Sequence, residues 1–118
     1  MRKLILALLL TAFAAVAADV SGTWQFNVET NQGSGAPTVV LRQDGEKLAG
    51  TFTSRIFGEV AITGSVKGNV FEFGFVGEAG GQKVKVSYHG TVESATTMKG
   101  TAVYTGFDDK VTWTATKK

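Results

Sequence analysis

From residue 22 onward, apolar and polar residues alternate in short stretches along the whole chain. In the first stretch, GTWQFNVET, the residues Trp24, Phe26 and Val28 take every second position and polar residues take most of the others. A period of two places successive side chains on opposite faces of a β-strand, so this stretch has one apolar face. Similar stretches recur between turn signals and predict eight strands, at residues 22–30, 37–43, 46–54, 59–66, 69–76, 81–92, 97–105 and 110–117.

The predicted strands are joined by short segments, which favours antiparallel hairpins between neighbours in the sequence. Several glycines fall inside the strands, where a glycine weakens a flat sheet but allows strong coiling: Gly50, Gly64, Gly74, Gly90 and Gly100. Eight strands also suffice for a meander to close on itself. We therefore predict an all-β, eight-stranded antiparallel up-and-down (meander) barrel whose first and last strands pair. A two-layer sandwich is the alternative.

The turn residues predict how the strands pair. An Asp44-Gly45 turn would set Leu41 opposite Leu48 and Arg42 opposite Lys47, and a Lys67-Gly68 turn would set Ile62 opposite Phe73. A four-residue loop at 77–80 would set Phe73 opposite Val84, and the last hairpin would set Ala102 opposite Trp113.

The alternation also predicts which side chains face the barrel interior. They are almost all apolar or aromatic: Trp24, Phe26, Val28, Val39, Leu41, Leu48, Phe52, Val60, Ile62, Phe71, Phe73, Phe75, Val84, Val86, Tyr88, Met98, Tyr104, Val111 and Trp113. These side chains either fill the interior completely or leave a pocket toward one end, because Gly90, Gly100 and Ala102 thin one wall. For a pocket, the predicted ligand-binding residues are Trp24, Phe26, Phe52, Phe73, Tyr88, Tyr104 and Trp113.

The first residues have the layout of a secretory signal peptide. Arg2 and Lys3 precede an apolar run that ends in Ala15-Val16-Ala17, a small-x-small cleavage site. The run is shorter than the roughly 20 residues that a membrane span needs. We expect cleavage after Ala17 or one residue later, which leaves one domain at residues 18–118 in the periplasm or outside the cell, with no membrane insertion. Because the chain has no cysteine, a lipid anchor and disulfides are excluded.

Charge and motifs exclude several functions. Of the 12 Lys and Arg residues, Arg2 and Lys3 belong to the leader, so residues 18–118 carry 10 basic and 10 acidic side chains. That balance gives no electrostatic basis for binding nucleic acid. The single histidine, His89, falls on the outer face, and the Asp108-Asp109 pair is explained by turn chemistry. We therefore predict no catalytic residues, no metal and no cofactor.

The chain resembles a group of uncharacterised exported bacterial β-domains. The resemblance rests on the opening G-T-W, the hairpins LRQDGEKLAGTF and ITGSVKGNVFEF, and the closing WTAT. More distantly it is similar to calycin barrels, the lipocalins and the streptavidin type, which share a G-x-W start. That similarity implies a lumen that takes small apolar molecules, but it carries over no particular ligand.

Three functions remain open at this point. The first is a binding module, expected to be a monomer, for a small apolar or aromatic molecule in the lumen. The second is a structural or protein-interaction module of the cell envelope with a filled core, using the loop SRIFGE or the outer wall. The alternative for this loop, which carries Arg55 and Phe57, is that it packs over the barrel end. The third is a small barrel enzyme that works through the hydroxyls of Tyr88 and Tyr104.

Overall fold

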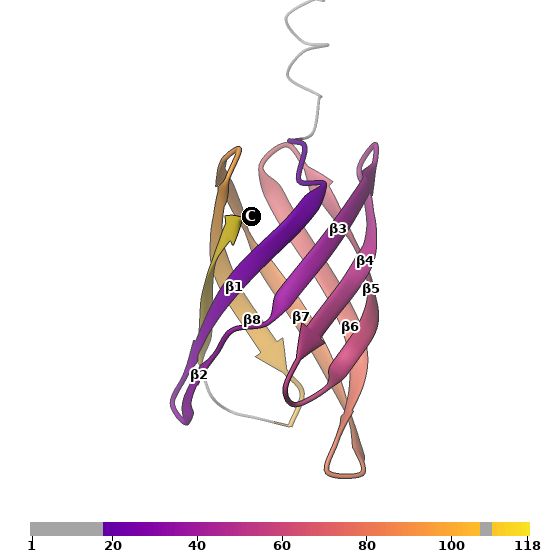
Figure 1. The fold of residues 1–118 in the computed structure, drawn as a ribbon, viewed down its shortest axis with the longest axis vertical. Coiled ribbons are helices and arrows are strands. Elements are labelled where there is room, and N and C mark those ends of the chain that lie inside the picture. The colour runs from indigo at the N-terminus through magenta and orange to yellow at the C-terminus, as the bar shows by residue number, and fades with distance from the viewer. Residues whose placement is uncertain (1–17, 107–109) are drawn as a thin grey trace, which may run out of the picture.

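The structure, a computed structural model, describes residues 18–106 and 110–118, and every regular element in that part of the chain is a strand. The strands are β1 (Gly22–Thr30), β2 (Gly33–Gly35), β3 (Thr38–Asp44), β4 (Lys47–Ser54), β5 (Gly58–Lys67), β6 (Val70–Ala79), β7 (Gln82–Ser94), β8 (Thr97–Tyr104) and β9 (Val111–Lys117) (Figure 1). All eight predicted strands are present, and their ends agree within three residues. The predicted leader, residues 1–17, and the Asp108-Asp109 turn lie outside the described residues.

The strands form a closed antiparallel meander barrel, as predicted. Each long strand pairs with its neighbours in sequence, and β1 pairs with β9 from Trp24 opposite Lys117 to Glu29 opposite Thr112. The short strand β2 was not predicted. It pairs with the end of β1, while β3 pairs with the start of β1. The strands β2 and β3 therefore follow one another along the same edge of β1.

The predicted pairings were wrong by an even number of residues. Leu41 lies opposite Gly50, Phe73 lies opposite Gly64 and Tyr88, and Trp113 lies opposite Gly100. The prediction put glycine second in the two-residue turns, whereas Gly45 and Gly68 are the first central residues, with φ of 64° and 57°. This is the pattern of a II′ turn, in which only the first central residue needs a positive φ.

An even shift leaves every side chain on its predicted face, since side chains alternate with a period of two. It also removes the predicted like-charge pair, because Arg42 lies opposite Ala49 and Lys47 lies opposite Asp44.

Glycines inside the strands allow neighbouring backbones to approach closely. A Cβ atom at Gly50 would overlap the carbonyl oxygen of Val40, and one at Gly64 would overlap that of Glu72. At Gly100 a Cβ would overlap the carbonyl oxygen of His89 on the neighbouring strand β7. These positions accept no side chain, which explains why glycine stands there and how the sheet curves enough to close.

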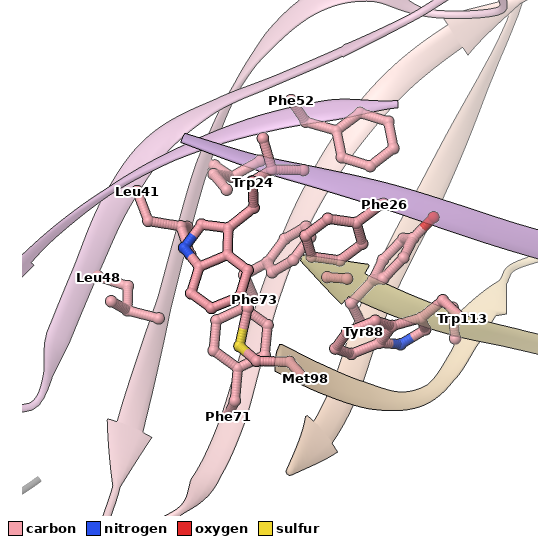
Figure 2. Packing of buried hydrophobic residues seen from close by; sticks show 14 of the residues in the cluster. Trp24, Phe26, Leu41, Leu48, Phe52, Phe71, Phe73, Tyr88, Met98 and Trp113 are labelled. Atoms are coloured by element: carbon pink, nitrogen blue, oxygen red, sulfur yellow. The ribbon is translucent and has the colours of Figure 1, made fainter. Parts of the chain in front are cut away.

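The predicted inward face is the core of the barrel. All nineteen predicted side chains are buried except Val60 and Tyr104, which are partly buried and pack against the same cluster (Figure 2). Five further buried residues complete the core: Val20, Val66, Val92, Ala102 and Ala115.

Residues 18–20, which precede the first strand, cover one end of the barrel. Val20 is fully buried, and its carbonyl oxygen accepts a 2.9 Å hydrogen bond from Nε1 of Trp24. The side chain of Gln43 holds this segment in place: its Oε1 accepts from the Val20 amide at 2.8 Å, and its Nε2 donates to the Ala18 carbonyl at 2.7 Å. We call this end of the barrel the capped end; it lies at the top of Figure 1.

Candidate functional site

The opposite end of the barrel carries the loop between β4 and β5 and the hairpin turn between β6 and β7, at the bottom of Figure 1. The loop consists of residues 55–57, of which Arg55 and Ile56 are exposed while Phe57 is partly buried. Phe57 packs against the core cluster. We call this the Phe57 end. The loop SRIFGE was predicted either to make a surface contact or to pack over the barrel end, and the packing of Phe57 agrees with the second prediction.

Aromatic rings occupy the middle of the barrel. The Phe26 and Trp113 rings stack with centroids 4.7 Å apart, and the Phe73 and Tyr88 rings stack at 4.8 Å. Phe26 then meets Phe73 edge-on at 6.1 Å, which joins the two pairs into one cluster (Figure 2). Stacked and edge-on rings at these distances attract one another beyond the gain from burying their surface. The middle of the barrel is therefore packed core.

The thin wall predicted at Gly90 leaves no void. The six-membered part of the Trp113 indole lies against Gly90, where a Cβ atom would come within 2.6 Å of Cζ2. Trp113 was predicted to lie opposite Ala102. The two-residue shift in strand pairing brings it opposite Gly100 and next to Gly90. The missing side chains make room for the indole.

The structure places all seven predicted ligand-binding residues on the inner side of the barrel wall, but it does not bring them to one pocket. Trp24 lies under the capped end, bonded to Val20. Others belong to the stacked rings in the middle of the barrel. Phe52 continues the aromatic cluster toward the Phe57 end, with its centroid 4.6 Å from that of Phe75. Of the seven, Tyr88 and Tyr104 bring their hydroxyl groups together.

The hydroxyl oxygens of Tyr88 and Tyr104 lie 2.5 Å apart and share one hydrogen bond. The Tyr88 side chain is fully buried, whereas Tyr104 is partly exposed. Burial raises the pKa of Tyr88 well above its usual value, and the neighbouring Tyr104 raises it further. Burial also raises the pKa of Tyr104, partly offset by its hydrogen bond to Tyr88. Both hydroxyls therefore stay protonated at neutral pH, where they can donate hydrogen bonds but cannot serve as bases.

Because of the tyrosine pair, the free energy of unfolding should decrease at alkaline pH. An unfolded tyrosine loses its proton near pH 10, while folded Tyr88 keeps its proton. The pair's contribution is therefore fully present below about pH 10 and falls as the pH rises above it, by up to about 1.4 kcal/mol per pH unit from Tyr88. Urea denaturation at about pH 8 and about pH 11, for the wild type and Tyr88→Phe, measures this dependence.

The chain has only two tyrosines, so tyrosinate absorbance reports on this pair alone. We expect the absorbance to rise together with unfolding. Tyrosinate that forms near pH 10 while the barrel is still folded would contradict the predicted shift. The Tyr88→Phe variant is the reference that separates the contribution of Tyr88 from the remaining pH dependence of the free energy of unfolding.

Three residues at the Phe57 end were missing from the predicted site. Phe57 stacks beside Tyr104 with centroids 6.3 Å apart and meets Phe75 edge-on at 5.6 Å. The third is Gly77, where a Cβ atom would overlap Cδ1 of Phe57. Alternation had assigned Phe75 to the core, but it says nothing about where a loop side chain points. Gly77 was assigned to a loop and instead lies in β6.

The outer wall carries a separate shallow groove of about 280 Å³ that is open to solvent. Its lining residues are Thr63, Gly64, Glu72, Phe73, Gly74, Ser87 and His89. His89 is exposed, as predicted, and its Nδ1 lies 3.4 Å from a carboxylate oxygen of Glu72. Across residues 18–106 and 110–118, no three His, Cys, Asp or Glu side chains gather as a metal site would require. The same residues include no helix of the length and apolar character that a membrane crossing needs.

Comparison with known proteins supports the fold. No family model and no curated protein matches the chain. Among solved structures, the redesigned β-barrel mFAP1 bound to DFHBI has a TM-score of 0.62 at 18% identity, covering 83% of this chain and 94% of that one. The redesigned barrel mFAP0 bound to DFHBI has a TM-score of 0.60 at 18% identity, covering 83% and 98%. A fluorescence-activating β-barrel designed de novo has a TM-score of 0.56 at 17% identity, covering 83% and 93%.

The protein is thus a small, closed, antiparallel β-barrel that resembles designed fluorescence-activating barrels. At these identities the likeness concerns the fold alone, and the resemblance to exported bacterial β-domains stays a prediction.

Proposed function

We propose that this protein is an exported, monomeric binding protein for a small apolar or aromatic molecule, which it takes up at the Phe57 end. The observation that carries the proposal is the hydrogen-bonded Tyr88–Tyr104 pair, set among apolar side chains with one partner partly exposed. Ligand sites are typically apolar with a few placed polar groups that fix orientation. A tyrosine pair at the end of an aromatic interior matches that description.

The packing of the barrel supports this end as the entrance. Residues 18–20 cover the capped end, and stacked rings fill the middle. At the other end, within the described part of the chain, the aromatic side chain of the loop residue Phe57 packs against the core. The designed barrels mFAP1 and mFAP0 bind the small molecule DFHBI, which shows that barrels of this fold can hold such a ligand.

Native mass spectrometry of the protein purified from the organism that makes it tests export and binding together. We expect the mass of a polypeptide that begins at Ala18 or Asp19. We also expect a bound small molecule that organic solvent extracts. With the extracted molecule added back, Tyr104→Phe should lower the affinity about two- to tenfold, because it removes one hydrogen bond. The exposed substitution Val103→Ala, on the same strand, is the control.

Two results would count against the proposal. A polypeptide that retains residues 1–17 after purification would contradict export. A protein that carries no small molecule, and whose tryptophan fluorescence responds to no apolar probe, would contradict binding.

A protein-interaction module is the second candidate, and the exposed tip of the loop favours it. Ile56 is 70% exposed beside Arg55, so the loop tip presents an apolar and a cationic side chain to solvent. Cross-linking in the envelope fraction, followed by Ile56→Ser, separates the two candidates. A defined protein partner that Ile56→Ser releases would favour interaction over ligand binding.

A further inference from the structure

The Phe57 ring sits in a seat at the barrel end that is shaped for a flat ring. Gly77 forms one side of the seat, because its missing side chain leaves room for the edge of the Phe57 ring. The Tyr104 ring forms a second side, inclined by 22° to Phe57, and Phe75 closes the seat edge-on at 78°. Flat and edge-on neighbours of this kind suit an aromatic ring better than an alkyl chain.

A hydrogen-bond donor belongs to the same seat. The Tyr88 and Tyr104 hydroxyls carry two protons between them, and their shared hydrogen bond uses one. Among the hydrogen bonds of the described residues, the second proton has no protein acceptor. Either hydroxyl can donate the shared bond, and when Tyr88 donates it, this proton lies on Tyr104, whose ring stacks beside Phe57. A molecule in the seat would gain by offering an acceptor oxygen to this proton.

Phe57 is attached to the seat by its loop and not by a strand. Its amide donates a 3.1 Å hydrogen bond to Oγ of Ser54, and Gly58 follows with a φ of 68°. Both neighbours in the loop, Arg55 and Ile56, are exposed. The Phe57 ring can therefore leave the seat by a local change in residues 55–57, while the pairing of β4 with β5, which ends at Ser54 opposite Gly58, remains intact.

We propose that this seat binds one aromatic ring carrying a hydrogen-bond acceptor, such as a carbonyl oxygen, and that Phe57 occupies the seat when the ligand is absent. The inference rests on the proposed binding function. It adds the class of ligand and the residue that blocks the seat, Phe57, which we call the gate. A ligand must then compete with Phe57, so its apparent affinity is reduced by the fraction of molecules in which the seat is free. Removing the Phe57 ring removes that competition.

Three matched probes test the ligand class: acetophenone, ethylbenzene without the acceptor, and cyclohexyl methyl ketone without the aromatic ring. Their binding to the folded protein is followed by chemical-shift titration of backbone amides. We expect Phe57→Ala to bind acetophenone about tenfold more tightly than the wild type does, and more tightly than it binds either other probe. Ile56→Ala, in the same loop, should leave all three affinities unchanged.

Gly77→Ala separates a ligand seat from a simple lid. The added methyl group expels Phe57 and at the same time fills the seat, so Gly77→Ala should not gain affinity. The double variant Phe57→Ala/Gly77→Ala should lose the gain of Phe57→Ala. Adding both Tyr88→Phe and Tyr104→Phe to Phe57→Ala should remove the preference for acetophenone over ethylbenzene, because the rings stay and both hydroxyl donors go. Phe57→Leu replaces Phe57→Ala if the latter does not keep the amide spectrum of a folded barrel.

The outcomes distinguish the inference from the function beneath it. If no probe binds the wild type, Phe57→Ala or Phe57→Leu, and the native protein carries no ligand, both are wrong. If probes bind but Phe57→Ala and Gly77→Ala leave their affinities unchanged, the seat and its gate are wrong while binding stands. If ethylbenzene or the cyclohexyl ketone binds Phe57→Ala as tightly as acetophenone does, the ligand class is wrong.

Discussion

Gly50→Ala should destabilise the barrel by about 3 kcal/mol or more, because the new methyl group has nowhere to go. Its Cβ would overlap the Val40 carbonyl oxygen and lie 2.9 Å from the carbonyl carbon. Both atoms belong to the backbone of β3, so no side-chain rotation relieves the overlap, and β3 and β4 must separate. Urea denaturation followed by tryptophan fluorescence measures the loss.

Gly35→Ala is the matched control for Gly50→Ala. Gly35 also lies in a strand, but a Cβ there meets nothing within 4 Å and its φ lies outside the left-handed region. This substitution should change the free energy of unfolding by less than about 1 kcal/mol. Equal effects at the two positions would mean that the close approach of β3 and β4 is not what requires glycine at position 50.

Trp113→Ala should cost about 3–5 kcal/mol, the range for truncating a large buried aromatic side chain. The indole stacks on Phe26, lies against Gly90 and donates a 2.9 Å hydrogen bond to the Thr101 carbonyl. Gly90 has no side chain to fill the space that the indole leaves. Denaturation followed by far-UV circular dichroism measures the effect, since the substitution also removes a fluorophore.

Val103→Ala controls for the loss of apolar surface as such. Val103 is 59% exposed on β8, the strand that pairs with β9, so the change should stay within about 0.5 kcal/mol. A loss below about 1 kcal/mol for Trp113→Ala would show that the core can collapse around the missing ring.

Alternation along the chain was enough to predict the strands, the closure and the buried face. Whether a side chain faces the interior depends on whether its position along the strand is odd or even. A pairing error of two residues therefore leaves Phe73 and Trp113 inside. The pairing itself depends on which residue of a tight turn takes the positive φ. Gly45 and Gly68 satisfy that need at either turn position, so glycine's presence alone could not choose between them.

The state of the lumen could not be predicted, because it depends on contacts between distant strands. Gly90 indicated a thin wall, but only the observed pairing brings Trp113 against it. Val20 lies before the first predicted strand, and Gln43 gave no signal that it would hold Val20 in place. The loop of Phe57 was expected to pack over the barrel end, but the alternation could not predict which rings Phe57 contacts there.

The pairing of β1 with β9 has a consequence for the order of events during biosynthesis. Trp24 lies opposite Lys117, so the barrel cannot close until β9 has been synthesised. Contacts between such distant positions make folding slow compared with proteins whose contacts are local. For the export proposed above, that delay is useful. A chain whose barrel stays open until β9 is available can still pass through a narrow translocation channel. It then folds on the far side of the membrane.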